Sequence, residues 1–315
     1  TTRVEDAVEP LLKSKWGQSE PYNKMTHYFT GCVATAVAQV MYYHKWPAQG
    51  KGQESYKLSF DNTTRSADFT KSHYDWENML PDYKRRRVTT LQEDAVALLM
   101  NDVGIATHMQ YTNGASGTSD YMAVRALRNN FDYDAALISR AHEGVANFIE
   151  VVKKELRNGF PLYISGYSSA GAGHAWVCDG FDKEDRFHMN FGWDGQANGY
   201  YSLATLNVTS TGSEFNGAPQ AFNSRLQVMA IHPNKPGTSK IDADIAYQSP
   251  NISCRYESEM TFVGNAPTTL SSSTKVMCSG FINQSESELV GDIGLGIYNQ
   301  EGKLIKATPY GQDGK

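Results

Sequence analysis

The chain of 315 residues contains only four cysteines, and no two of them are spaced as CxxC. Four cysteines in a chain of this length do not make a disulfide framework, and without a CxxC pair a structural zinc site has no support. Cys254 and Cys278 lie near each other in the C-terminal part, and a bridge between them is left open because its geometry is unknown. We expect no metal and no organic cofactor.

Long apolar runs and an excess of positive charge are also missing. No stretch approaches the roughly 18 consecutive apolar residues that cross a membrane, so no transmembrane segment is expected. The formal net charge of −5 gives no global reason to bind nucleic acid. The one basic cluster, residues 84–87, fits a solvated loop better than an interaction patch. The N-terminus has no signal-peptide core, which suggests a soluble chain in its processed form.

The order of the predicted elements indicates the fold class. With 40% hydrophobic residues and roughly 150 residues per domain, about two domains are expected. Helical patterns cover residues 4–15, 91–103 (with Gly104 as its stop), 120–130 and 145–157. Short strand patterns then cover residues 161–167, 174–181, 186–191 and 200–203. Helices followed by strands, without regular βαβ alternation, predict an α+β domain with a helical layer on a largely antiparallel sheet.

A break at residues 232–237 separates this domain from short β runs near the C-terminus. We predict a first domain over residues 1–236 and a small immunoglobulin-like β-sandwich over residues 239–315. The chain stops abruptly at residue 315, so an incomplete sandwich is left open, as is a surface or partner contact through it.

Cys32 has the setting of a reactive thiol. It follows Thr30-Gly31 and begins an alanine-rich apolar run, residues 33–41, which predicts a buried helix. Unpaired N–H groups and the helix dipole favour a thiolate at this end, where cysteine pKa values fall from about 8.5 to roughly 3.5–7.5. An inert buried helix cysteine is the alternative. We interpret Cys32 as a candidate nucleophile.

A thiolate nucleophile needs a base, a group that orients the base, and donors for the oxyanion. His174 follows a glycine-rich loop and begins a predicted strand, although a structural strand-end histidine is the alternative reading. In the hairpin with residues 186–191, position 174 falls opposite about 190–193. Asn190 is then predicted to accept from the imidazole N–H, and the Trp193 indole to shield that bond from water.

Four motifs in order resemble the streptopain family of bacterial cysteine peptidases, which has the papain-like fold. They are Gly17-Gln18 with Pro21-Tyr22-Asn23, Gly31-Cys32-Val33-Ala34-Thr35-Ala36 through Gln39-Val40-Met41, Gly173-His174-Ala175 with Asp179-Gly180, and Asn190-Phe191-Gly192-Trp193. The resemblance runs from about Val4 to Pro233. The separation of Cys32 and His174 is also in the range of about 130–150 positions typical of papain-like peptidases.

The resemblance implies a role for each motif. Cys32 would be the nucleophile, His174 the general base and acid, and Gln18 the side-chain donor that joins the Cys32 N–H in the oxyanion hole. Asn190 and Trp193 match the segment that supports the histidine. The family is made as a secreted zymogen, which implies a bacterial secreted or cell-surface protein, an N-terminal propeptide as inhibitor, and protein or peptide substrates.

The predicted function is therefore a cysteine endopeptidase, and the family's preference implies a bulky apolar side chain two residues before the cleaved bond. The loop with Gly114, Ser116, Gly117 and Ser119 is a candidate part of that subsite, because a Gly/Ser loop can offer backbone partners to an extended substrate. Gly173 and Ala175, beside His174, are further candidates. Two alternatives remain: acyl transfer to an amine, as in a transpeptidase or amidase, and a non-catalytic adhesion or binding protein acting through the sandwich.

Overall fold

The computed structural model describes residues 6–242, except 85, 113, 169–170, 204–206 and 209–219, and the backbone of six short strands between residues 252 and 309. The chain divides into two compact units, Thr1–Ser249 and Pro250–Lys315. Each unit is described by itself.

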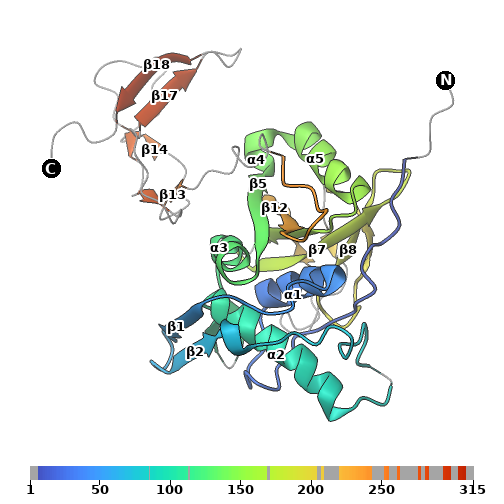
Figure 1. The fold of residues 1–315 in the computed structure, drawn as a ribbon. Coiled ribbons are helices and arrows are strands. Elements are labelled where there is room, and N and C mark those ends of the chain that lie inside the picture. The colour runs from blue at the N-terminus through green and yellow to red at the C-terminus, as the bar shows by residue number, and fades with distance from the viewer. Residues whose placement is uncertain are drawn as a thin grey trace. The chain divides into compact units, whose positions relative to one another are not determined.

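The first unit is built on a six-stranded antiparallel sheet (Figure 1). Its strands, in spatial order, are β5 (Tyr133–Ser139), β12 (Ser224–Pro233), β6 (Leu162–Tyr167), β7 (Gly173–Phe181), β8 (Phe187–Asn190) and β9 (Gly199–Tyr201). The four strands expected from the sequence are all present. The other two, β5 and β12, were not predicted, and β12 is inserted between β5 and β6.

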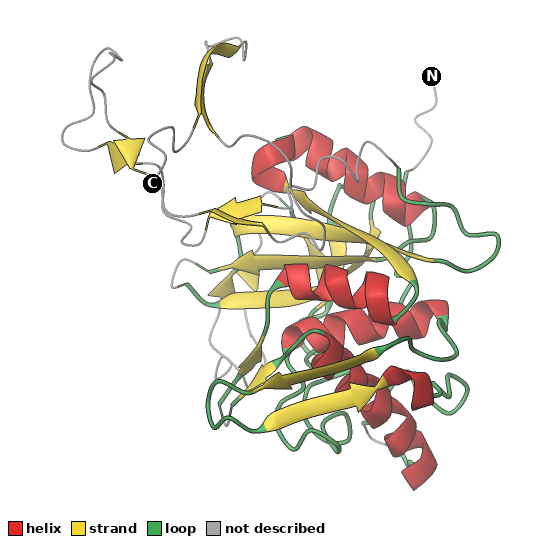
Figure 2. Cartoon of the chain, turned by 60° about the vertical axis from the view of Figure 1, so that its left-hand side comes forward, coloured by secondary structure: helices red, strands yellow, loops and turns green. Residues whose placement is uncertain are grey.

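Helices cover both faces of this sheet (Figure 2). They are α1 (Cys32–His44), α2 (Thr90–Ala106), α3 (Asp120–Asn130), α4 (Arg140–Glu143) and α5 (Val145–Arg157), with a 3-10 turn at Phe69–Lys71. In β7, Ala175 and Val177 belong to the core shared with α1, whereas Trp176 and Cys178 belong to the core shared with α5. Because the strand is buried on both faces, its sequence is nearly continuously apolar. The predicted α+β class is confirmed.

Three pairs of short strands complete the first unit. They are β1 (Gln53–Lys57) with β2 (Thr64–Asp68), β3 (Gln110–Tyr111) with β4 (Ser116–Gly117), and β10 (Asn207–Val208) with β11 (Gln220–Ala221). All three pairs are antiparallel. The β3–β4 pair matters for the site, because β4 lies within the loop predicted to contact the substrate.

The helix expected over residues 4–15 is wrong for its described part. From residue 6 onward this segment is irregular, and Val8 exchanges both backbone hydrogen bonds with Phe181 at the end of β7. The backbone N–H of Leu11 donates to the carbonyl of Asp179. Pro10 has no N–H and cannot sit comfortably in a helix interior. Pairing with β7 therefore outweighs the weak helical periodicity.

Gly104 does not end its helix as expected, since α2 continues to Ala106. The glycine is needed for close packing: a Cβ at this position would lie 1.9 Å from the Tyr111 hydroxyl. Tyr111 is in β3, so the glycine lets α2 approach the β3–β4 pair. The helices predicted at residues 120–130 and 145–157 are confirmed as α3 and α5.

The second unit contains three antiparallel strand pairs. They are β13 (Ile252–Cys254) with β16 (Phe281–Asn283), β14 (Thr261–Phe262) with β15 (Val276–Met277), and β17 (Gly294–Tyr298) with β18 (Leu304–Pro309). The β-sandwich over residues 239–315 stays a prediction, because most of that range, including Cys278, lies outside the described residues. Ile241 is buried in the core of the first unit.

Candidate active site

Cys32 is the first residue of α1. Gly31 precedes it with φ 88°, a conformation that favours glycine, and a Cβ there would lie 2.6 Å from the Met109 sulfur. The helix begins with the Thr35 N–H donating to the Gly31 carbonyl at 3.0 Å. The following residues, 33–41, are all buried, while Cys32 itself is partly exposed. The thiol therefore stands at the positive end of a buried helix, as predicted.

His174 is the second residue of β7, and its imidazole is almost fully buried. Nε2 lies 3.0 Å from the carbonyl oxygen of Phe191. Since a carbonyl can only accept, Nε2 carries the proton and donates it to this bond. In the neutral ring, Nδ1 is then the basic nitrogen. The tautomer of His174 is therefore set by a main-chain group.

Aromatic rings surround this imidazole. The Trp193 ring stacks on it with centroids 4.5 Å apart and an interplanar angle of 24°. Phe222 and Trp176 follow at 5.5 and 5.8 Å. Rings at these distances exclude water from the bond between Nε2 and the Phe191 carbonyl, which strengthens the bond by lowering the local dielectric. Trp193 thus lies beside His174, where the sequence placed it.

Asn190 is not placed to orient His174 as predicted. Its side-chain Oδ1 accepts from Gln39 Nε2 at 3.3 Å, and its Nδ2 donates to the Ser14 carbonyl at 2.7 Å. The register explains the difference, because Asn190 pairs with Val177, whose side chain faces α1, whereas His174 faces the aromatic rings on the opposite side of the sheet. The two side chains therefore leave the sheet on opposite faces.

Gln18 is buried, and its backbone is held next to the start of α1. Its carbonyl accepts from the Thr30 N–H at 3.0 Å, two positions before Cys32. On the other side, the Asp194 N–H donates to the Trp16 carbonyl at 3.1 Å. Gly17 lets the two segments approach, since a Cβ on it would lie 2.5 Å from the Asp194 carboxylate. These contacts hold the segment of Gln18 next to the start of α1, which carries Cys32, and next to the segment after β8, which carries Trp193.

Gln39 connects these parts from the inside of α1, a function that sequence reasoning missed. Its side chain is fully buried, and its Oε1 accepts from Ser14 Oγ at 2.9 Å and from the Trp16 N–H at 3.3 Å. Its Nε2 donates to Asn190 Oδ1 at 3.3 Å. The helix of Cys32, the segment of Gln18 and the segment after β8 are joined through this one amide. A glutamine within an apolar helical run was the available signal.

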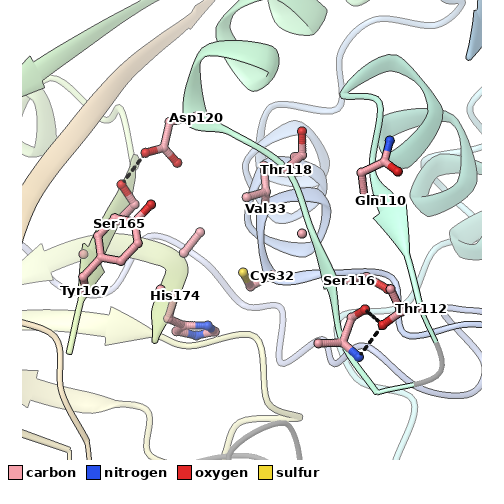
Figure 3. Close-up of a pocket in the computed structure, with 15 residues that line it drawn as sticks. Cys32, Val33, Gln110, Thr112, Ser116, Thr118, Asp120, Ser165, Tyr167 and His174 are labelled. Atoms are coloured by element: carbon pink, nitrogen blue, oxygen red, sulfur yellow. Dashed lines mark hydrogen bonds between the residues drawn. The ribbon is translucent and has the colours of Figure 1, made fainter. Parts of the chain in front are cut away.

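Cys32 and His174 line the same pocket, whose volume is about 450 Å³ (Figure 3). The lining residues are Cys32, Val33, Gln110, Thr112, Ala115, Ser116, Gly117, Thr118, Asp120, Ser165, Gly166, Tyr167, Gly173, His174 and Ala175. The pocket includes four of the six residues predicted to contact substrate: Ser116, Gly117, Gly173 and Ala175. Gly114 and Ser119 lie within the same loop but are not among the lining residues.

The polar wall of this pocket was not expected from the sequence. Asp120, the first residue of α3, accepts hydrogen bonds from Tyr163 Oη, Ser165 Oγ and Gln227 Nε2. Burial, and then the negative charge of Asp120, raise the pKa of the Tyr167 phenol in the same wall. Within the part of the chain that the structure describes, no group of three or more His, Cys, Asp or Glu side chains is placed to hold a metal ion.

The chain is similar to known cysteine peptidases. The sequence profile of the peptidase C10 family matches residues 16–201. Streptopain of Streptococcus pyogenes is 34% identical over an alignment that covers 72% of this chain and 63% of streptopain, so the chain spans less than two thirds of that relative. The thiol protease/hemagglutinin PrtT of Porphyromonas gingivalis is 33% identical over 66% of this chain and 25% of its own length.

Two solved structures are similar in fold. Active wild-type interpain A, a cysteine protease of Prevotella intermedia, superposes with a TM-score of 0.64 at 36% identity and covers 71% of this chain and 94% of its own. A fragment of prointerpain A from the same organism gives a TM-score of 0.60 at 33% identity, covering 71% of each chain.

Proposed function

Because the chain belongs to the peptidase C10 family, we propose that it is a cysteine endopeptidase acting through a Cys32 acyl-enzyme. The observation that carries the proposal is the pocket itself. It is lined by a cysteine at a helix N-terminus and by a buried histidine whose Nε2–H is committed to a carbonyl. A thiol and an oriented imidazole on one pocket are the parts that nucleophilic acyl transfer needs.

The reaction follows from these positions. His174 takes the thiol proton on Nδ1, and the resulting imidazolium still donates from Nε2 to the Phe191 carbonyl. The Cys32 thiolate attacks the peptide carbonyl and forms a tetrahedral intermediate. His174 then delivers its proton to the leaving amine, and water releases the acyl group with the roles reversed. No cofactor takes part in these steps.

The oxyanion of the intermediate needs donors close to Cys32. The Cys32 N–H is at the first position of α1, where backbone N–H groups have no partner within the helix. Gln18 is held next to this turn through the bond of its carbonyl to Thr30. Its side-chain amide is the second donor in our proposal. In this chemistry, removing one oxyanion donor raises the activation barrier by about 2.7–4 kcal/mol. Two such donors therefore stabilise the developing negative charge by several kcal/mol.

The substrate is proposed to lie along the loop that includes β4. Ser116 and Gly117 line the pocket, and no atom lies within 4 Å of a Cβ built on Gly117, so a substrate backbone can approach it. Gly173 and Ala175 line the side next to His174. The family resemblance adds a preference for a bulky apolar side chain at the second residue before the cleaved bond. Gly114 and Ser119 act through the shape of the loop in this proposal.

The cellular setting is proposed from the relatives. Secretion or display at the bacterial surface and inhibition by an N-terminal propeptide are supported by the similarity to streptopain and to a fragment of prointerpain A. In the described part of the chain, no helix has the length and apolarity needed to cross a membrane. The C-terminal unit is proposed to contact a surface or partner.

The test is peptide cleavage under reducing conditions, with and without an epoxide inhibitor directed at cysteine. We expect inhibitor-sensitive cleavage of a peptide library, mass addition of the inhibitor at Cys32, and loss of both in Cys32→Ala. Cys178→Ala is the matched control, because that thiol is fully buried and burial raises its pKa well above the ordinary value. Products joined to an added amine would favour acyl transfer. Folded protein that neither cleaves nor reacts would favour a binding role.

A further inference from the structure

One end of the pocket carries a negative charge. Figure 3 shows Asp120, Ser165 and Tyr167 on one side of Cys32 and His174, with Gln110, Thr112 and Ser116 on the other. Asp120 is the one acidic residue among the fifteen lining residues, and lysine and arginine are absent from them. Arg225 lies outside this lining, with its guanidinium 5.4 Å from the centroid of the Tyr167 ring. The one charge in the lining itself is negative, which favours a cationic group over a carboxylate.

The Asp120 carboxylate is held firmly but is not neutralised. Its hydrogen-bond partners are two hydroxyls and one amide, those of Tyr163, Ser165 and Gln227. None of these donors carries a charge, and no ion pair of Asp120 with a lysine, arginine or histidine is found among the described residues. Three donors also leave one of the four acceptor positions of a carboxylate for a ligand. Asp120 is thus an oriented anion with capacity for one more donor.

The strand register places this anion close to the reacting groups. Ser165 pairs with Ala175 on β7 and with Gln227 on β12, so the three residues form one row across the sheet. Side chains in such a row share one face, with about 4.8 Å between neighbouring strands. Ala175 directly follows His174 on β7. Ser165, which donates to Asp120, therefore lies on the strand next to the one that carries His174.

Apolar groups line the pocket together with Asp120. Val33 and Ala175 both line the pocket and contribute methyl groups, and the Tyr167 ring lies on the same side as Asp120. A lysine or arginine side chain has an apolar stem and a charged end, which matches apolar walls that lead to a carboxylate. A purely aliphatic side chain would contact the same walls and leave the remaining acceptor position of the carboxylate unused.

We propose that this pocket accepts a lysine or arginine side chain at the second substrate residue before the cleaved bond, with its stem along Val33 and Ala175 and its cationic end at Asp120. The inference rests on the proposed function and specifies its substrate. Asp120 directly follows the loop already proposed for this subsite, which supports the assignment of the position. The bulky apolar preference of the family is thereby extended to side chains whose bulk is an aliphatic stem.

The test compares three fluorogenic peptides that differ only at this position, with arginine, its neutral isostere citrulline, or leucine. We expect kcat/KM for arginine to exceed that for citrulline at least tenfold at low ionic strength, and the ratio to fall with added salt. In Asp120→Asn the ratio should approach one, because the arginine peptide should lose more kcat/KM than the citrulline or leucine peptide. Glu150→Gln, an exposed change of the same charge on α5, should leave the ratio unchanged.

The outcomes separate the inference from the proposed function. Cleavage of the leucine peptide with an arginine-to-citrulline ratio below three would overturn the inference alone. An equal loss for all three peptides in folded Asp120→Asn would also overturn it, because a structural role predicts that pattern. Absence of any cleavage and of inhibitor labelling at Cys32 would overturn the proposed function. If Asp120→Asn does not fold, the ratio in the unaltered protein and its salt dependence decide.

Discussion

Replacing Gln39 with leucine should both destabilise the protein and slow its reaction. Leucine fits a similar volume but removes the acceptor of Ser14 Oγ and Trp16 N–H and the donor to Asn190. All these groups are buried, so water cannot replace the lost partners. The segment of Gln18, the helix of Cys32 and the segment that supports His174 would lose the hydrogen bonds through which Gln39 connects them.

The magnitude follows from the number of groups left without a partner. The Trp16 N–H and the Ser14 hydroxyl both donate to Gln39 Oε1 and lose this acceptor. A buried polar group left without a partner costs about 1–3 kcal/mol. Asn190 Oδ1 keeps a second donor, the Gly192 N–H, at 3.3 Å. We expect a net loss of about 2–4 kcal/mol, since the hydroxyl can rotate and leucine adds apolar contact. For a unit of this size, that loss lowers the melting temperature by roughly 4–16 °C.

The assay combines urea unfolding with steady-state kinetics on a cleavable peptide. Because displacement of catalytic groups by about 1 Å can cost about 10²-fold, kcat should fall by about 10- to 100-fold while KM changes little. Gln53→Leu is the control, since Gln53 is exposed on β1. If Gln39→Leu unfolds at the same urea concentration as the unaltered protein and keeps its kcat, Gln39 does not hold the site together and the reasoning is refuted.

Three further predictions concern the oxyanion, the substrate loop and pH. Gln18→Ala should lower kcat by roughly 10²–10³, and a fall below about threefold would remove Gln18 from the oxyanion hole. Gly117→Pro should change both the rate and the specificity measured on a peptide library, whereas unchanged values would exclude this loop from the subsite. Burial, followed by the positive charges of His232 and Lys235, lowers the pKa of His44 from 6.5 to about 4. Between these pH values His44 binds a proton in the unfolded chain but not in the folded chain. The free energy of unfolding should therefore fall by up to about 3 kcal/mol from pH 6.5 to pH 4. Urea unfolding of His44→Phe should show that this pH dependence is lost.

Local patterns in the sequence were sufficient for much of the fold. The helix that begins at Cys32 and the hairpin of β7 and β8 follow from composition, periodicity and turn residues. The four ordered motifs were sufficient for the family and its papain-like fold, which the match to interpain A confirms. These features depend on residues close to one another in the chain, where physical preferences can be evaluated without knowing the tertiary structure.

Pairing between distant segments could not be obtained in this way. β12 lies between β5 and β6, although it follows β6 in the sequence by more than fifty positions. Residues 8–12 run beside the end of β7 because the sheet offers hydrogen-bond partners there, which no local pattern encodes. The carboxylate of Asp120 was missed for the same reason, since its partners come from two strands of the sheet.

The acceptor of His174 is the instructive case. An asparagine in the second strand of the predicted hairpin was a reasonable partner for the imidazole, but the alternation of side chains along β8 turns Asn190 toward α1. The group that remains on the histidine's side is the carbonyl of Phe191, which every residue type would present. Its position depends on the chain turning after β8, where Gly192 has φ 72° and a Cβ would lie 3.0 Å from Thr35. The identity of residue 191 therefore matters less for the tautomer of His174 than the glycine that follows it, because the glycine sets where the carbonyl points.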